Sequence, residues 1–212
     1  RCDVLRFGDF VTKSGRRTPF FINTGNFDTG ERLRRLGEFY AAAIESQLTG
    51  GYDLLYGPAY KGIPLATATA AALAANHGID VPVLYNRKEA KDHGEGGRLI
   101  GRTPQAGDRV LIIDDVVTAG TSVRESAAIL REAAPVQLAG LAVSVDRQER
   151  GSGTRSALAE VAAEYGLHAF AIVTLAEIVD WLHNRPIDGS VVLDDAMLER
   201  ITDYRRQYGA DA

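Results

Sequence analysis

The sequence predicts an α/β fold in which a parallel, doubly wound sheet is flanked by helices and carries a small N-terminal flap. Short apolar runs alternate along the chain with segments whose apolar residues recur at helical spacing. The runs are rich in Val, Ile and Leu and do not alternate with polar residues, which is typical of strands buried on both faces of a parallel sheet. The 212 residues suit one domain, residues 1–212, rather than two.

The flap is expected mainly from residues 1–28. Apolar and polar residues alternate over 4–23 on both sides of a turn-like segment, which indicates a hairpin. Phe20, Phe21 and Ile22 have side chains expected in a core, and Lys13 and Arg16 are expected to be solvated at the turn.

The other elements follow from apolar spacing and end signals. A helix begins at Thr29 and ends before a pair of glycines, and another follows residue 122. Further helices are expected over 63–76, 156–165, 174–183 and 194–208. Strands are expected over 53–56, 81–86, 110–113, 138–145 and 168–173. Residues 88–98 contain three glycines and a single apolar residue, so they are expected to form a mobile lid loop.

Composition excludes several classes of protein. A net charge of −4 and a pI near 5.6 disfavour a large nucleic-acid footprint. One cysteine argues against a disulfide framework and fits a reducing compartment. No apolar stretch reaches the length of a membrane span, and no secretory signal is visible. We therefore expect a cytoplasmic protein without nucleic-acid or membrane partners.

The stretch 110–122, VLIIDDVVTAGTS, joins a buried strand, an acidic pair and a loop of small residues. Asp114 and Asp115 stand at the carboxyl end of the strand, where open α/β sheets place their ligands. The loop leads into a helix, whose first amide groups attract a phosphate. The loop lacks the lysine of a P-loop and the glycine spacing of a dinucleotide site. Unless it is an ordinary Asp-rich turn, the stretch indicates a phosphorylated sugar.

Cations follow other strands of the predicted sheet. Lys61 begins a helix after the strand at 53–56, Arg87 and Lys88 follow the next strand, and Arg147 follows the strand at 138–145. Each alone is equally well a surface residue. Parallel strands with right-handed crossovers, however, bring the carboxyl ends of these three strands and of the strand at 110–113 to one edge of the sheet. This arrangement indicates a polyphosphorylated sugar and a second, anionic ligand.

Four segments in this order, GPAYKGIP, NRKEAKDHGEGG, DDVVTAGTS and DRQERG, resemble the orotate phosphoribosyltransferases of the type I phosphoribosyltransferase family. The resemblance implies that family's fold and a Mg²⁺-dependent pentosyltransferase. It implies transfer of the 5-phosphoribosyl group of phosphoribosyl diphosphate (PRPP) to orotate, giving orotidine 5′-phosphate and pyrophosphate in pyrimidine (UMP) biosynthesis. It also implies a homodimer in which lid residues act in the neighbouring site.

The resemblance also assigns residues. The catalytic set is Lys61, Lys91, His93, Asp114 and Asp115. The PRPP-binding set is Lys13, Tyr60, Lys61, Arg87, Lys88, Lys91, His93, Asp114, Asp115, Val116, Val117, Thr118, Ala119, Gly120, Thr121 and Ser122. The orotate-binding set is Lys13, Phe21, Ile22, Thr118 and Arg147. No protein ligand to the metal is expected. Ile22 departs from the second aromatic residue that is common in the family, and a base role for Asp115 stays open.

Two alternatives remain at this stage. A phosphoribosyltransferase for another base would share the stretch 110–122, although the lid and the DRQERG segment disfavour it. A PRPP-sensing regulator of the same fold is disfavoured because no basic stripe or DNA-binding motif is present.

Overall fold

The computed structural model describes residues 2–12, 15–91 and 97–210, without the side chains of residues 90, 91 and 97. Its centre is a six-stranded sheet in the order β5-β4-β3-β6-β7-β8. The strands are β3 (Leu54–Gly57), β4 (Val83–Lys91), β5 (Gly97–Gly101), β6 (Arg109–Asp114), β7 (Gln137–Asp146) and β8 (His168–Thr174). All neighbouring pairs are parallel except β4 and β5. The predicted fold class is confirmed.

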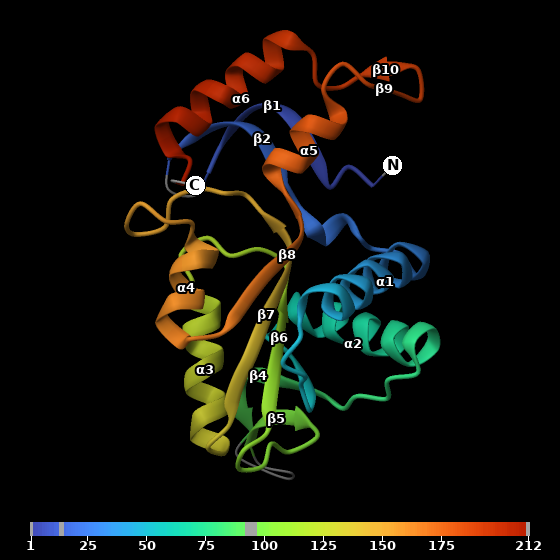
Figure 1. Ribbon diagram of the computed structural model, residues 1–212, viewed down its shortest axis with the longest axis vertical. Coiled ribbons are helices and arrows are strands. Elements are labelled where there is room, and N and C mark those ends of the chain that lie inside the picture. The colour runs from blue at the N-terminus through green and yellow to red at the C-terminus, as the bar shows by residue number, and fades with distance from the viewer. Residues whose placement is uncertain (1, 13–14, 92–96, 211–212) are drawn as a thin grey trace.

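Helices cover both faces of the sheet (Figure 1). The helices α1 (Gly30–Gln47) and α2 (Gly62–Ala72) lie on one face, and α3 (Thr121–Ala133) and α4 (Ala157–Tyr165) lie on the other. Successive side chains of β6 enter the two cores alternately, with Leu111 and Ile113 toward α1 and Val110 and Ile112 toward α3. This confirms that the central strand is buried on both faces.

A hood lies beyond the carboxyl edge of the sheet, at the top of Figure 1. It contains the antiparallel hairpin β1 (Leu5–Val11) and β2 (Arg17–Ile22), with α5 (Leu175–Leu182), the short pair β9 (Pro186–Ile187) and β10 (Ser190–Val191), and α6 (Asp195–Tyr208). Phe20 is fully buried there and meets the ring of Tyr204 edge-on at 5.6 Å. The hairpin was predicted, but its shared core with the two C-terminal helices was not.

The predicted helix starts agree closely with the structure. Thr29, Ser156, Thr174 and Asp194 are all N-caps, and each side chain accepts a hydrogen bond from an amide in the first turn. The expected helix over 63–76 is divided, because α2 ends at Ala72 and a π-helical turn, η2 (Leu73–His77), follows. A 3-10 turn, η1 (Thr24–Asn26), was not expected.

The prediction for the strand before the lid was wrong. β4 continues to Lys91 because β5, which was not predicted, pairs with it and extends it. Arg87 and Lys88 therefore lie within a strand rather than beyond one. The edges of the predicted 88–98 loop are strand, and its central residues 92–96 lie outside the described part of the chain.

No helix in the described ranges is both long enough and apolar enough to cross a membrane.

Candidate active site at the carboxyl edge of the sheet

The acidic pair lies at the centre of the sheet edge, at the end of β6. Asp114 and Asp115 are only 6% and 8% exposed. The Oδ2 atom of Asp115 accepts hydrogen bonds from Thr24 Oγ1 (2.7 Å) and Lys61 Nζ (2.8 Å), and its Oδ1 accepts from the Val116 amide (2.9 Å). Three segments therefore meet at one carboxylate: η1 after the hairpin, the start of α2, and the loop after β6.

Asp114 connects the strand to the following helix. Its Oδ2 accepts a hydrogen bond from Ser122 Oγ at 2.9 Å, and its Oδ1 accepts from the Asp115 amide at 2.9 Å. Burial, together with the neighbouring charge of Asp115, raises the pKa of Asp114 above the ordinary range for aspartate. Burying two adjacent carboxylates costs folding free energy, and the packing of the fold does not require this pair.

The loop from 116 to 120 presents the start of α3. Gly120 is the N-cap of α3 with a φ of 72°, and no side chain caps the first turn. A Cβ atom at Gly120 would lie 2.6 Å from Val161 Cγ2, so glycine meets both a conformational and a spatial requirement. Arg124 holds the loop from the helix side by donating to the Ala119 carbonyl at 2.7 Å. The amides at this helix start can therefore bind an anion.

A second uncapped helix start lies next to it. Lys61 is the N-cap of α2 and its side chain makes no capping bond there. α2 packs tightly on β3, since a Cβ on Gly57 would lie 2.3 Å from the Gly62 carbonyl oxygen. Asn86 fixes the intervening turn because its Oδ1 accepts from Tyr56 OH (2.9 Å) and from the Ala59 amide (2.8 Å). The Ala59–Tyr60 peptide bond in this turn is cis.

Cations accompany this second helix start. Lys88 Nζ lies 5.1 Å from the centroid of the exposed Tyr60 ring, and Arg87 is half-buried in β4. Together with Lys61 they supply positive charge on the β4 side of the acidic pair. Some of the residues predicted to bind a diphosphate are described by the structure. These residues thus come from neighbouring elements.

A cavity of about 600 Å³ opens on the other side, between the hood and the β7–α4 connection. Phe20 and Phe21 of the flap, Thr118 of the 116–120 loop, and Arg147 all line it. The Arg147 guanidinium lies 5.2 Å from the centroid of the Phe20 ring, and its Nη2 donates to Glu149 Oε1 at 2.6 Å. Phe21 and Ile22 were expected to contact orotate through their backbone; Ile22 is not part of this cavity's lining, and its side chain packs in the hood core.

The expectation that Arg16 is solvated was wrong. Its Nη1 donates to Glu149 Oε2 at 3.2 Å, and its guanidinium lies 4.4 Å from the centroid of the Tyr208 ring. Arg16 also lines the cavity. The turn-like sequence around it gave no sign of this, because both partners, Glu149 and Tyr208, are far from Arg16 in sequence.

Several further residues were not anticipated. Thr24 contacts the acidic pair, and Phe20 contacts Arg147. Glu149 lines the cavity and contacts Tyr204, which lies behind it. None carries a local sequence signal, although Glu149 lies within the DRQERG segment. Three predicted residues cannot be placed: Lys13 and His93 lie outside the described residues, and only the backbone of Lys91 is described.

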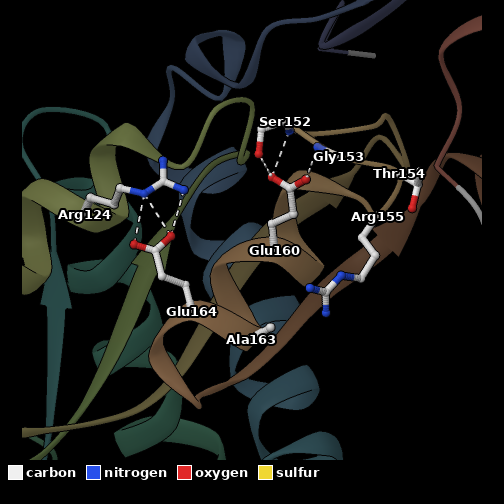
Figure 2. Close-up of a pocket in the computed structure, with 8 residues that line it drawn as sticks. All are labelled: Arg124, Ser152, Gly153, Thr154, Arg155, Glu160, Ala163 and Glu164. Carbon is white, nitrogen blue, oxygen red and sulfur yellow. Dashed lines mark hydrogen bonds and ion pairs between the residues drawn. The ribbon is translucent and has the colours of Figure 1, made fainter.

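A second hollow of about 610 Å³ lies beside the first, outside the 151–155 loop (Figure 2). Glu160 accepts from the amides of Ser152 (2.9 Å) and Gly153 (2.6 Å), and the same amides lower the pKa of its carboxyl group. Arg124 pairs with Glu164 at 2.8 Å. Glu160, Arg124 and Glu164 are thus engaged with the protein itself, and Glu160 fastens the loop whose residues Gly151 and Ser152 also line the first cavity.

Within the described ranges, no three His, Cys, Asp or Glu side chains group closely enough to hold a metal ion. The two carboxylates of the acidic pair are hard oxygen donors, but they do not form a complete coordination shell. A metal here would need most of its ligands from a substrate and water.

Comparison with known proteins identifies the family of the chain. Residues 23–161 match the model of the phosphoribosyl transferase domain. The chain is 54% identical to an orotate phosphoribosyltransferase from Clostridium beijerinckii over 209 residues, which cover 99% of this chain and 93% of that protein. A crystal structure of orotate phosphoribosyltransferase from Francisella tularensis matches with a TM-score of 0.83 and 36% identity, covering 99% of this chain and 96% of the other.

A third match is UMP synthase from Leishmania donovani, with a TM-score of 0.72 and 26% identity. It covers 96% of this chain but only 40% of that longer protein. The family match and the near-complete coverage at high identity lead to one conclusion: the chain belongs to the orotate phosphoribosyltransferase family of the phosphoribosyl transferase domain proteins.

Proposed function

We propose that the chain transfers the 5-phosphoribosyl group of PRPP to orotate, yielding orotidine 5′-phosphate and pyrophosphate in pyrimidine biosynthesis. The observation that carries the proposal is the arrangement at one sheet edge. An acidic pair and two uncapped helix starts lie beside a cavity lined by aromatic residues and Arg147. Each part suits a different group of the two substrates.

The PRPP half is built around β6. The carboxylates of Asp114 and Asp115 accept hydrogen bonds from the 2′- and 3′-hydroxyls of ribose, and the 116–122 backbone binds the 5′-phosphate. Tyr60, Lys61, Arg87 and Lys88 surround the diphosphate. Lys61 is paired with Asp115 in the structure, and its side chain is 56% exposed, so a diphosphate can reach it. Lys13, Lys91 and His93 remain predictions from the sequence for the same group.

The orotate half is the cavity beside Arg147. In the described part of the chain, the Nε of Arg147 is buried without a hydrogen-bond partner. An unpaired buried donor is costly, and a planar carboxylate is the ligand that guanidinium matches best. Orotate carries one carboxylate on a flat ring, which the exposed Phe21 can border, while the buried Phe20 packs against Arg147. Thr118 joins this cavity to the phosphate loop.

The chemistry follows from charge. Breaking the bond between C1 and pyrophosphate leaves positive charge on the sugar ring and negative charge on the leaving group. Lys61 and Lys88 stabilise the leaving group, and the acidic pair lies at the sugar. Orotate is already anionic, so no strong general base is required, and no nucleophilic side chain takes part. Mg²⁺, held mainly by substrate oxygens and water, would neutralise charge on the diphosphate.

The assembly is part of the proposal. Residues 1–212 form one phosphoribosyltransferase domain, with the flap and the 88–98 lid as its appendages. The chain acts in the cytoplasm as a homodimer, and lid residues close over the neighbouring site, excluding water.

Pyrophosphate release from PRPP tests the function directly. Release that depends on both orotate and Mg²⁺, and that uracil, adenine, guanine and hypoxanthine do not support, is the expected result. Release with another base instead would assign a different phosphoribosyltransferase. PRPP binding without release with any base would favour the regulator.

A further inference from the structure

Glu149 lies in the β7–α4 connection and receives hydrogen bonds from three separate parts of the chain. Its Oε1 accepts from Arg147 Nη2 (2.6 Å) and from Tyr204 OH (2.8 Å), and its Oε2 accepts from Arg16 Nη1 (3.2 Å). The side chains of Glu149 and Arg147 are only 17% and 18% exposed. This carboxylate therefore joins the flap, the base cavity and α6.

We propose that Glu149 is a positioning residue for the base substrate. Its carboxylate holds the Arg147 guanidinium in the orientation that receives the substrate carboxylate, and Tyr204 acts through Glu149. The inference rests on the proposed function, and it concerns how the subsite for the base is held in its orientation.

The Arg147 guanidinium is held from two directions. The Phe20 ring lies along it at 5.2 Å from the ring centroid, and Glu149 takes one Nη2 hydrogen. Its remaining donors include the buried Nε that has no partner among the described residues. A guanidinium recognises a carboxylate through paired, coplanar hydrogen bonds, so a side chain with four rotatable bonds needs such support.

The charges in the network leave room for an anion. Two guanidinium groups, those of Arg16 and Arg147, share one carboxylate at Glu149. Over the whole lining of the cavity, four arginines (Arg16, Arg124, Arg147 and Arg150) face three carboxylates (Asp146, Glu149 and Glu160), so the described side chains leave one positive charge in excess. Glu149 itself would repel an anionic base at close range. Its role is therefore to hold the arginines rather than to touch the substrate.

Tyr204 supports the carboxylate from behind. Its hydroxyl donates to the same Oε1 that Arg147 uses, and its ring meets Phe20 edge-on at 5.6 Å. The two groups that hold Arg147, the Phe20 ring and the Glu149 carboxylate, therefore both contact one side chain of α6, that of Tyr204. Removing only the hydroxyl leaves the ring in place, so Tyr204→Phe isolates the polar contribution.

The test is steady-state kinetics of pyrophosphate release, with orotate and PRPP varied separately. Glu149→Gln preserves size but removes the charge, and we expect it to raise KM for orotate about tenfold, the loss typical of one charge-assisted hydrogen bond. KM for PRPP should change by less than about twofold, since its subsite lies on other elements. Tyr204→Phe should give a smaller shift in the same direction, and no further shift in the Glu149→Gln background.

Glu31→Gln is the matched control, because it removes the same charge from an exposed Arg–Glu pair on α1, where Arg34 Nε lies 2.8 Å from Glu31 Oε2. Both KM values should stay at the wild-type level in this variant. Denaturation midpoints of all variants separate loss of folding from loss of positioning.

Three results would overturn the inference. A lowered orotate KM in Glu149→Gln would mean that Glu149 competes with the substrate for Arg147. Equal increases for orotate and PRPP would mean a general structural role. An undiminished Tyr204→Phe effect in the Glu149→Gln background would mean that Tyr204 does not act through Glu149. An inactive wild-type protein would instead refute the proposed function.

Discussion

The two halves of the candidate site are built in different ways. The ribose and phosphate part of the half assigned to PRPP is one continuous stretch, from β6 through the acidic pair into α3, in which Ser122 donates to Asp114; Thr24 and Lys61 reach Asp115 from other elements. The half assigned to orotate is assembled from β2, the β7–α4 connection and α6. A continuous stretch serves a donor common to many bases, whereas a composite wall can select one base.

The largest expected effect lies in the continuous half. Asp115→Asn removes the charge that Thr24, Lys61 and the Val116 amide all approach. Turnover should fall by about 10²–10³-fold, as for loss of one preorganised electrostatic group. The fall in turnover should be equally large at low and at saturating orotate, which single-turnover kinetics can check. A defect that excess orotate corrects would show that the two halves are not separate.

The next effect lies in the composite half. Arg147→Ala should raise KM for orotate by about 10- to 100-fold, because a carboxylate loses a charge-assisted partner. PRPP affinity, measured by direct titration, should change little. Equal weakening of both substrates would contradict the assignment of Arg147 to the base. Arg147→Lys should recover only part of the loss, since an ammonium cannot replace a planar fork.

A third prediction concerns stability rather than binding. Burial raises the pKa of Asp114, so the folded protein binds its proton more tightly than the unfolded chain does. The protein should therefore lose stability as the pH rises from about 4, the ordinary aspartate value, through the raised pKa. Asp114→Asn should increase the free energy of unfolding by about 1–3 kcal/mol at neutral pH while reducing activity.

Urea denaturation at several pH values checks this prediction. The stability difference between Asp114→Asn and wild type should shrink below about pH 4. A difference that is independent of pH would mean that the buried charge is not its cause.

The smallest effect lies outside both halves. Asp53 pairs with Arg109 at 2.8 Å at the opposite edge of the sheet, and Arg109 lowers the pKa of Asp53 to about 2. This stability is present above about pH 4 and is lost as the pH falls toward the lowered value. Because both side chains are partly exposed, Asp53→Asn should cost less than about 1 kcal/mol. Kinetic constants should not change, which makes this variant a control for the others.

The contrast between the two halves also explains what the sequence could predict. The acidic pair, the loop and the start of α3 are close in sequence, so their physical pattern is visible without a structure. Phe20, Glu149 and Tyr204 make contacts set by the docking of the hood, and no local pattern reports that docking. Arg147 was predicted because it follows a strand and lies within a recognisable segment, but its support by Glu149 was not.

The extent of β4 shows a similar limit. Residues 88–91 are polar, so they give no apolar signal for a strand. They are a strand because β5 supplies backbone hydrogen bonds along an edge of the sheet, where polar side chains are tolerated. Backbone pairing of this kind depends on the partner strand rather than on side-chain patterning.

The position of Tyr204 has a consequence for biosynthesis of the chain. Every strand of the central sheet is translated before α6, so the acidic pair and its loop can assemble while the last helix is still absent. The apolar face of the first hairpin, with Phe20 at its centre, packs against both α5 and α6, so it is fully covered only after α6 has been made. Until α6 has been translated, the hairpin of the nascent chain therefore has an incompletely covered aromatic surface, and this is the interval in which the chain is most open to chaperones and to aggregation.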